Sequence, residues 1–321
     1  MTEDWRPTAT RRTLEARAAM LARARAFFAE RGVLEVDTPI LGAGGTTDPQ
    51  IESLSTRVRG IDAPRYLATS PEFAMKRLLA AGAGPIYQIG KVFRDEEHGR
   101  WHNPEFTMIE WYRPGLTDGD LMSEVEALVA ALLAPHRPLR AAERLTYADA
   151  LGRHAGVDGA SASVADLRRA ADAHGIVCDA PLDRDAALDL LMGLVVGPRL
   201  GRDAPCFVTD YPASQASLAR LKPGNPPVAA RFELYLDGIE LANGFHELSD
   251  AREQRARFET DLATRRERGQ RLPAIDRRLL DALEAGLPDC AGVALGFDRL
   301  VALAIGAAAL REALAFPIDR A

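Results

Sequence analysis

The chain has 321 residues, 47% hydrophobic and 27% charged, which is typical of a soluble globular protein with one large domain or two ordinary ones. No apolar run is long enough to cross a membrane, and three scattered cysteines argue against a zinc site or a disulfide framework, so a cytoplasmic location is expected. The net charge of −6 lacks the basic surplus of a protein whose main task is to bind nucleic acid.

The first predicted elements are a helix and a short strand. Residues 1–12 are polar and are expected to be flexible. A helix is indicated by apolar residues that share one face: Leu14, Ala18, Leu21 and Phe28. Residues 33–36 predict a strand that ends before Pro39, and residues 42–49 predict a polar loop. Within residues 66–82 we expect a strand, a turn and an apolar helix.

Residues 92–112 predict two strands around a polar loop. Arg94 and Glu96 lie two positions apart and point the same way, so one site receives a cation and a carboxylate. Arginine suits a phosphate because its planar fork gives bidentate bonds, and Phe106 offers a face for a purine. On its own, this Phe-Arg-x-Glu pattern is short enough to arise by chance.

Helical patterns return at residues 118–134, 163–174 and 184–197. The segment 135–205 is expected to be an insertion of small helices with Pro/Gly joints, and no chemistry is visible in it.

A second cluster of charge follows the strand at residues 206–208. Glu233, Glu240 and Glu247 recur every seven residues, which fits one helical stripe, but residues 232–236 and 239–241 favour two strands joined by a turn at Asp237-Gly238. Carboxylates this close would repel one another unless a cation such as Mg²⁺ bound between them. The alternative is a hairpin with solvent-facing glutamates.

The last predicted elements are a polar helix at residues 249–267, a strand at 292–295 and a closing helix. Asp298 is expected to cap that helix, which would run to Leu314. Arg299 then lies at the helix N-terminus, where a cation opposes the helix dipole, so we expect it to meet an anion. That anion is either a ligand or a carboxylate of the protein itself.

Strands at residues 33–112 and 206–296 around a helical block indicate an α+β fold. Neither a Gly-x-Gly-x-x-Gly nor a P-loop pattern is present, so a nucleotide would be held by other means.

Three segments together resemble the catalytic domain of class II aminoacyl-tRNA synthetases, lysyl-tRNA synthetase above all. Residues 32–39 resemble motif 1, residues 93–107 motif 2 and residues 292–299 motif 3. The similarity covers residues 13–321 and is weakest over 135–205. It implies a mainly antiparallel six-to-seven-stranded sheet flanked by helices, and a homodimer built on motif 1.

The resemblance also assigns roles. ATP would be bound by Arg94, Asp95, Glu96, Asn103, Phe106, Glu240, Leu241, Gly296 and Arg299. Arg94 and Arg299 would be catalytic through the phosphates, and Glu233 with Glu240 would hold Mg²⁺. A lysine substrate would be bound by Ser70, Pro71, Glu72, Tyr112, Ala242, Asn243, Glu247 and Ala294. Carboxylates and a phenol suit a dibasic amino acid, since each desolvated ammonium needs a partner.

The sequence departs from the lysyl-tRNA synthetase pattern at several positions, and these departures bear on which reaction is expected. Motif 1 begins almost at once, so no anticodon-binding domain is expected, and Ala242 and Ala294 replace glycines, which adds methyl groups to the predicted pocket. Residues 211–218 and Trp101 also differ. These features resemble the truncated lysyl-tRNA synthetase paralogues that modify translation elongation factor P. That family activates (R)-β-lysine with ATP as an adenylate and transfers it to a lysine ε-amine of the factor, releasing AMP and diphosphate.

The alternative is a free-standing lysine:tRNA ligase, which the acidic net charge does not favour. A catalytically dead binding subunit is opposed by the intact Arg94, Glu96, Glu240 and Arg299. A synthetase that makes a small-molecule amide is opposed by Glu72 and Glu247, which favour a dibasic substrate.

Overall fold

The computed structural model describes residues 5–95, 97–178 and 182–321. Its main sheet has nine strands in the order β1-β5-β6-β12-β11-β10-β8-β7, with β9 paired to β10. The strands are β1 (Leu34–Glu35), β5 (Ile86–Phe93), β6 (Glu105–Pro114), β7 (Glu143–Thr146), β8 (Cys206–Pro212), β9 (Leu221–Lys222), β10 (Val228–Leu236), β11 (Ile239–His246) and β12 (Cys290–Gly296). A small sheet contains β2 (Leu41–Gly42), β3 (Ser55–Thr56) and β4 (Arg65–Leu67).

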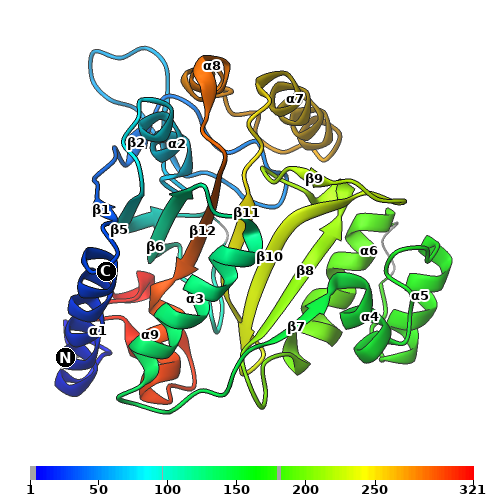
Figure 1. Ribbon diagram of the computed structural model, residues 1–321, viewed down its shortest axis with the longest axis horizontal. Coiled ribbons are helices and arrows are strands. Elements are labelled where there is room, and N and C mark those ends of the chain that lie inside the picture. The colour runs from blue at the N-terminus through cyan, green and yellow to red at the C-terminus, as the bar shows by residue number, and fades with distance from the viewer. Residues whose placement is uncertain (1–4, 96, 179–181) are drawn as a thin grey trace.

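The helices surround this sheet (Figure 1). They are α1 (Arg11–Ala29), α2 (Glu72–Ala80), α3 (Asp118–Leu133), α4 (Tyr147–Ala155), α5 (Val164–Ala173), α6 (Arg184–Leu191), α7 (Ala251–Glu267), α8 (Arg277–Gly286) and α9 (Phe297–Ile305). Within the described ranges, none of them is both long and apolar enough to cross a membrane.

The expected α+β class is confirmed, but the expected sheet is wrong in size and pairing. The sheet has nine strands instead of six or seven, and it is mixed, because β1 pairs parallel with β5 and β7 pairs parallel with β8. Two of the added strands, β1 and β9, contain only two residues, too short for an alternating pattern to reveal.

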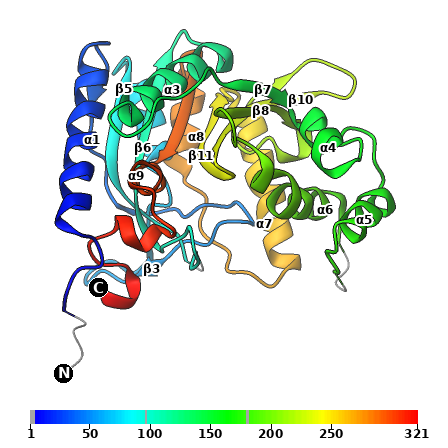
Figure 2. The same ribbon diagram turned by 90° about the horizontal axis from the view of Figure 1, so that it is seen from below.

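The two faces of the sheet differ in chemistry. On one face, Ile109 and Trp111 of β6 lie opposite Leu295 and Val293 of β12, and this buried layer is covered by α1, α3 and α9 (Figure 2). Side chains alternate along a strand, so the residues between them point to the other face. That second face carries Glu110 and therefore holds the polar groups described below.

β10 and β11 confirm the interpretation of the glutamate repeat as a hairpin. They pair antiparallel across the turn Asp237-Gly238, both of which adopt positive φ (54° and 78°). A bulge between Leu234 and Tyr235 shifts the register. Glu233 consequently lies opposite Asn243, on the face that carries Glu110.

The inserted segment forms a lobe at the end of the sheet opposite α1 (Figures 1 and 2). Helices α4, α5 and α6 pack with β8 around a separate apolar cluster that includes Leu151, Leu188 and Val208. The segment is more than the expected set of small helices, because β7 also extends the main sheet.

Two expectations about the closing helix need correction. Asp298 does not cap α9; Gly296 occupies that position, and the buried Asp298 carboxylate accepts hydrogen bonds from the Thr107 backbone N–H (2.7 Å) and from Arg17. α9 ends at Ile305 because Gly306 adopts a left-handed conformation, well before Leu314. In the N-terminal segment, the Thr8 backbone N–H donates a hydrogen bond to the Ala315 carbonyl (2.9 Å).

Candidate functional site

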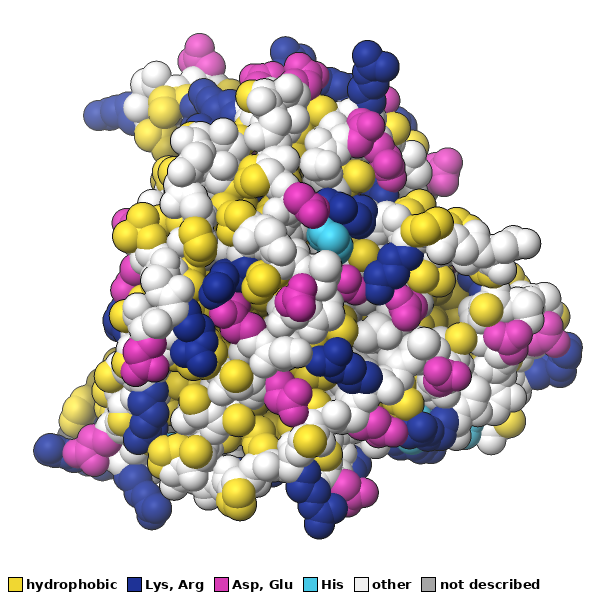
Figure 3. All heavy atoms as spheres, viewed as in Figure 1, with side chains coloured by type: hydrophobic (Ala, Val, Ile, Leu, Met, Phe, Trp, Pro, Cys, Tyr) yellow, Lys and Arg dark blue, Asp and Glu magenta, His cyan; other side chains and the backbone are white. Residues whose placement is uncertain are grey.

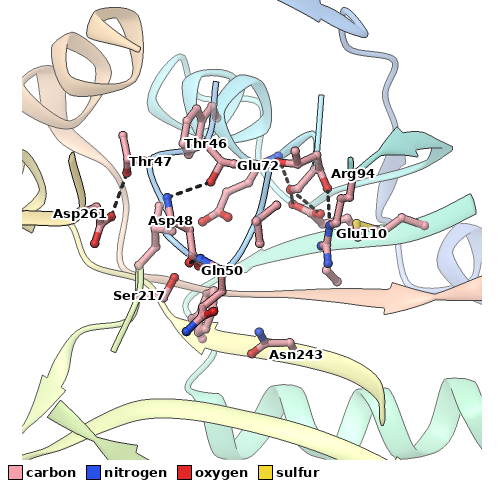
Figure 4. Close-up of a pocket in the computed structure, with 18 of the residues that line it drawn as sticks. Thr46, Thr47, Asp48, Gln50, Glu72, Arg94, Glu110, Ser217, Asn243 and Asp261 are labelled. Atoms are coloured by element: carbon pink, nitrogen blue, oxygen red, sulfur yellow. Dashed lines mark hydrogen bonds between the residues drawn. The ribbon is translucent and has the colours of Figure 1, made fainter. Parts of the chain in front are cut away.

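The second face of the sheet forms the floor of a cavity of about 1300 Å³. Figure 4 shows side chains from the loop around Thr46–Gln50, from α2, β6 and β11 around this space. The structure describes seventeen of the residues predicted from the sequence, and sixteen of them line the cavity: Ser70, Pro71, Glu72, Arg94, Asn103, Phe106, Tyr112, Glu233, Glu240, Leu241, Ala242, Asn243, Glu247, Ala294, Gly296 and Arg299. The fold therefore brings these predicted residues, which are far apart in sequence, to one cavity.

One end of the cavity is a cluster of acidic groups. Glu72 begins α2, Glu110 lies in the middle of β6, and Glu247 follows β11. The carboxylate of Glu110 accepts hydrogen bonds from the Ser70 hydroxyl (2.8 and 3.0 Å) and from the Tyr112 phenol (2.8 Å). These bonds fix its orientation before any ligand arrives.

Burial makes this cluster selective for cations. Loss of solvent, followed by the charge of Glu72, raises the pKa of Glu110 to about 8. Loss of solvent also raises the pKa of Glu247 to about 7, although the ammonium of Lys76 opposes the shift. Buried carboxylates held close together are stabilised in their charged form by a cation, so this end of the cavity suits an amine.

Glu110 was missed by the sequence analysis. Its signal was present: Met108, Ile109, Trp111 and Tyr112 make an apolar strand segment with one carboxylate at its centre. A charged residue in the middle of such a strand is costly unless it is paired or functional.

The other end of the cavity carries arginines. The Arg94 side chain donates to the Thr69 carbonyl (3.4 Å) and to Glu97 (3.2 Å), and its guanidinium lies 5.3 Å from the ring centre of Phe106. Arg299 donates to the backbone carbonyls of Trp101 (3.1 Å) and Glu240 (2.9 Å). Arg299 is thus positioned by backbone oxygens, whereas Arg94 is held by one backbone oxygen and the Glu97 carboxylate. Both guanidinium groups line the cavity. The aromatic ring beside Arg94 gives a planar ligand a surface on which to stack.

Two residues predicted to bind ATP, Asn103 and Asp95, make contacts with the protein itself. Asn103 is buried; its amide donates to the Glu105 carbonyl (2.6 Å) and accepts from the Ile318 backbone N–H (3.0 Å), so it holds the loop against the C-terminal residues. Asp95 binds Arg271 (2.8 Å). Glu96 lies outside the described residues.

The two predicted metal ligands, Glu233 and Glu240, differ in how many of their oxygens already accept a hydrogen bond from the protein. Glu233 accepts hydrogen bonds from Arg231 and from the Tyr235 phenol (2.7 Å), whereas Glu240 has Arg299 as its nearest cation at 3.9 Å. Loss of solvent and then the charge of Glu233 raise the pKa of Glu240. Across the described ranges, no group of three or more His, Cys, Asp or Glu side chains could hold a metal by itself. One or two carboxylates beside a phosphate site still fit Mg²⁺, which takes its other ligands from phosphate and water.

The two alanines that replace glycines in the synthetase pattern face opposite ways. Ala294 lies opposite both Glu110 and Asn243, so its methyl group points to the cavity. Ala242 lies opposite Leu295 and belongs to the apolar core on the other face. By this register the methyl group of Ala242 points to the core, because side chains alternate along β11, although the residue itself lines the cavity.

The loop at residues 43–51 and the inserted lobe complete the cavity wall. Thr47 donates to Asp261 of α7 (2.9 Å), and Gln50 donates to Asp189 of α6 (3.3 Å). Tyr147 of α4 also lines the cavity. The insertion, in which the sequence showed no chemistry, thus contributes to the site.

Comparison with known proteins places this site in a family. The family model of class II tRNA synthetases (D, K and N) matches residues 2–320. Curated relatives named elongation factor P–(R)-β-lysine ligase are 51% identical in Yersinia enterocolitica and 50% identical in Salmonella dublin and Salmonella agona. Each similarity covers 100% of this chain and 99% of the relative.

Proposed function

The chain belongs to the class II tRNA synthetases of the D, K and N group, and from this membership we propose that it is an ATP-dependent ligase that joins (R)-β-lysine to elongation factor P. The supporting observation is one cavity with an acidic end, made by Glu72, Glu110 and Glu247, and an arginine end, made by Arg94 and Arg299. An acidic end that binds amines and a cationic end that binds phosphates fit a diamino acid beside ATP. Relatives that match over their whole length carry the name of this activity.

The first step forms an adenylate. The acidic end holds the ammonium groups of β-lysine and directs its carboxylate towards the arginine end. A carboxylate oxygen attacks the α-phosphorus of ATP, the bond to the β-phosphate oxygen breaks, and diphosphate leaves. Arg94 and Arg299 stabilise the negative charge that develops on the phosphoryl oxygens. Phe106 stacks on the adenine ring.

Glu240, with Glu233 behind it, would hold Mg²⁺ at the phosphates. When bound, this ion neutralises phosphate charge. Loss of solvent and then the charge of Glu233 raise the pKa of Glu240, so a cation beside the two carboxylates would stabilise their charged form.

The second step transfers the β-lysyl group. The neutral ε-amine of a lysine on elongation factor P attacks the carbonyl carbon of the mixed anhydride, an amide bond forms, and AMP leaves. The amine loses its extra proton to solvent. No residue in the described part of the site is placed as an obvious general base, so the step relies on positioning and electrostatics.

The protein acts in the cytoplasm, where ATP and elongation factor P are available. It acts there as a homodimer. The surface near motif 1 supports the dimer: β1 is an edge strand, and Leu34 (58% exposed), Ile40 and Leu41 present apolar side chains to solvent. Exposed apolar side chains grouped near one edge are typical of an interface. Light scattering should give twice the mass of one chain.

Binding to tRNA has less support. Basic and acidic side chains are mixed across the face shown in Figure 3, in keeping with the net charge of −6. Proteins that grip nucleic acid gather their basic residues on one face.

ATP–pyrophosphate exchange tests the first step. With (R)-β-lysine, Arg94→Ala should lower the exchange rate by about 10²–10³-fold, since a fixed positive charge at the transition state is lost. Arg153→Ala, which removes an exposed arginine paired with Glu143, is the matched control and should leave exchange unchanged. Unchanged exchange in Arg94→Ala would show that this arginine does not act on the phosphates.

A further inference from the structure

The acidic end of the cavity contains a cation of its own. Lys76 lies one helical turn after Glu72 on α2, and its side chain is 1% exposed. The Lys76 ammonium is 2.7 Å from a Glu72 oxygen and 2.6 Å from a Glu247 oxygen. It is thus shared between two carboxylates that come from distant parts of the chain.

This lysine sets the charge that a ligand encounters. The pKa of Glu110 lies at about 8, so this carboxyl ionises when a cationic ligand binds beside it. The three glutamates then carry three negative charges, and Lys76 offsets one, which leaves two. An isomer of lysine brings two ammonium groups. The cluster is therefore balanced for a doubly cationic ligand, and an amino acid with one amine leaves a buried carboxylate unpaired, which is costly.

Lys76 also favours the ionised form of Glu247, because its ammonium opposes the rise in the pKa of that carboxyl. Two buried carboxylates without a cation share a proton, as in the dyad of an aspartic protease. Apart from its ion pair with Lys76, neither oxygen of Glu247 has a hydrogen-bond donor among the described residues. Glu247 therefore keeps acceptor capacity for a ligand, provided that it stays ionised.

We propose that Lys76 is a specificity-determining positioning residue: its ammonium holds the carboxylates of Glu72 and Glu247 in place and offsets one of their charges, so that the pocket selects a substrate with two amines. This inference rests on the proposed function, since the substrate is the diamino acid named there. Lys76 acts through the two carboxylates and does not itself touch the reacting atoms.

No other titratable group described around the acidic cluster takes the place of the Lys76 ammonium. The charged and titratable groups that face Lys76 and Glu247 from the packed elements are Glu72 of α2, Glu110 and Tyr112 of β6, Cys290 of β12 and Arg220 before β9. Burial raises the pKa of Cys290 to about 12 and that of Tyr112 well above its ordinary value, so neither exchanges protons near neutral pH. Arg220 donates to the backbone carbonyl of Glu247 (3.1 Å) and to Asp289, away from the carboxylate.

The test counts protons. Binding of (R)-β-lysine to the full chain with a non-hydrolysable ATP analogue is measured by calorimetry at pH 7, in buffers of different ionisation enthalpy. In Lys76→Met the carboxylates hold an extra proton that the substrate must displace, so up to about one more proton should be released than in wild type. Affinity should fall by about tenfold or more, and the preference over the analogue that lacks the terminal amine should shrink.

Two variants act as controls. Lys222→Met removes the lysine that bridges Asp118 (2.6 Å) and Asp210 (2.9 Å) outside the cavity, and should leave the proton count unchanged. Lys76→Gln removes the charge but keeps hydrogen-bond donors, and it carries the same test if Lys76→Met does not fold.

The outcomes are distinct. A wild-type proton count with reduced affinity would mean that Lys76 is only structural, and the inference would be wrong. The inference would also be wrong if neither Lys76→Met nor Lys76→Gln folds while Lys222→Met does. If the wild-type protein itself binds no diamino acid, the proposed function fails and the inference fails with it.

Discussion

Replacing Glu110 by glutamine should stabilise the empty protein and impair its function at the same time. Glu110 is a buried carboxyl whose pKa lies at about 8 instead of 4.5. Between these two pH values the folded protein keeps a proton that the unfolded chain has lost. The free energy of unfolding therefore falls as pH rises through this window, and it levels off above about pH 8.

The size of the effect follows from the shift. A pKa displaced from 4.5 to about 8 corresponds to a loss of up to about 5 kcal/mol by pH 9. Glutamine has the same shape and no charge to desolvate, so Glu110→Gln should escape this loss. Its melting temperature should exceed that of wild type at pH 9 by about 2–4 °C for each kcal/mol recovered, and the two proteins should converge near pH 5.

Substrate binding should change in the opposite direction. A desolvated ammonium that loses its charged partner costs about 3–5 kcal/mol, so the KM for (R)-β-lysine should rise by about 10²–10³-fold. Pyrophosphate exchange gives the KM, and thermal unfolding at pH 5, 7 and 9 gives the stability. Glu143→Gln, at an exposed ion pair, is the control. A KM within threefold of wild type, or the same pH dependence of stability, would refute this reasoning.

Three further substitutions test the geometry. Ala294→Gly should raise the activation of L-α-lysine relative to β-lysine by about tenfold, which is what one methyl group in a pocket is worth. Ala242→Gly, whose methyl group lies on the core face, should lower only the melting temperature. Equal effects of the two substitutions on selectivity would contradict the assigned faces. Gly292→Ala should abolish binding of the amino acid but retain binding of ATP in calorimetry, because the added Cβ would overlap the Tyr112 ring. Unchanged affinity for β-lysine would contradict this prediction. Asp298→Ala should lower stability by about 3–5 kcal/mol in urea unfolding, since it leaves a buried partner unpaired; an unchanged midpoint would show that the pair is dispensable.

The sequence was most informative where local pattern and chemistry agree. The Asp237-Gly238 turn between apolar strands predicted the hairpin that places Glu233 and Glu240, and the structure has it. Arg299 was identified because a cation at a helix start is expected to meet an anion. Arg94 was identified because it lies two positions from a carboxylate on a strand and its planar fork suits a phosphate. Both line one cavity.

What the sequence could not reveal depends on distant pairing. The parallel contacts of β1 and β7 involve strands of two and four residues, which leave almost no periodic signal. The face on which Ala242 lies is set by its register with Leu295, 53 positions later in the chain, which no local pattern contains. Lys76 looked like one polar residue of an apolar helix, and its role emerges only when Glu247 is folded against it.

The most direct test of the central claim is transfer of label. The protein is incubated with ATP, Mg²⁺ and radiolabelled (R)-β-lysine or L-α-lysine, with elongation factor P and bulk tRNA offered in separate reactions. The account predicts label on elongation factor P, more with β-lysine than with α-lysine, and none on tRNA. Label on tRNA from α-lysine, with none on elongation factor P, would contradict it and indicate a lysine:tRNA ligase.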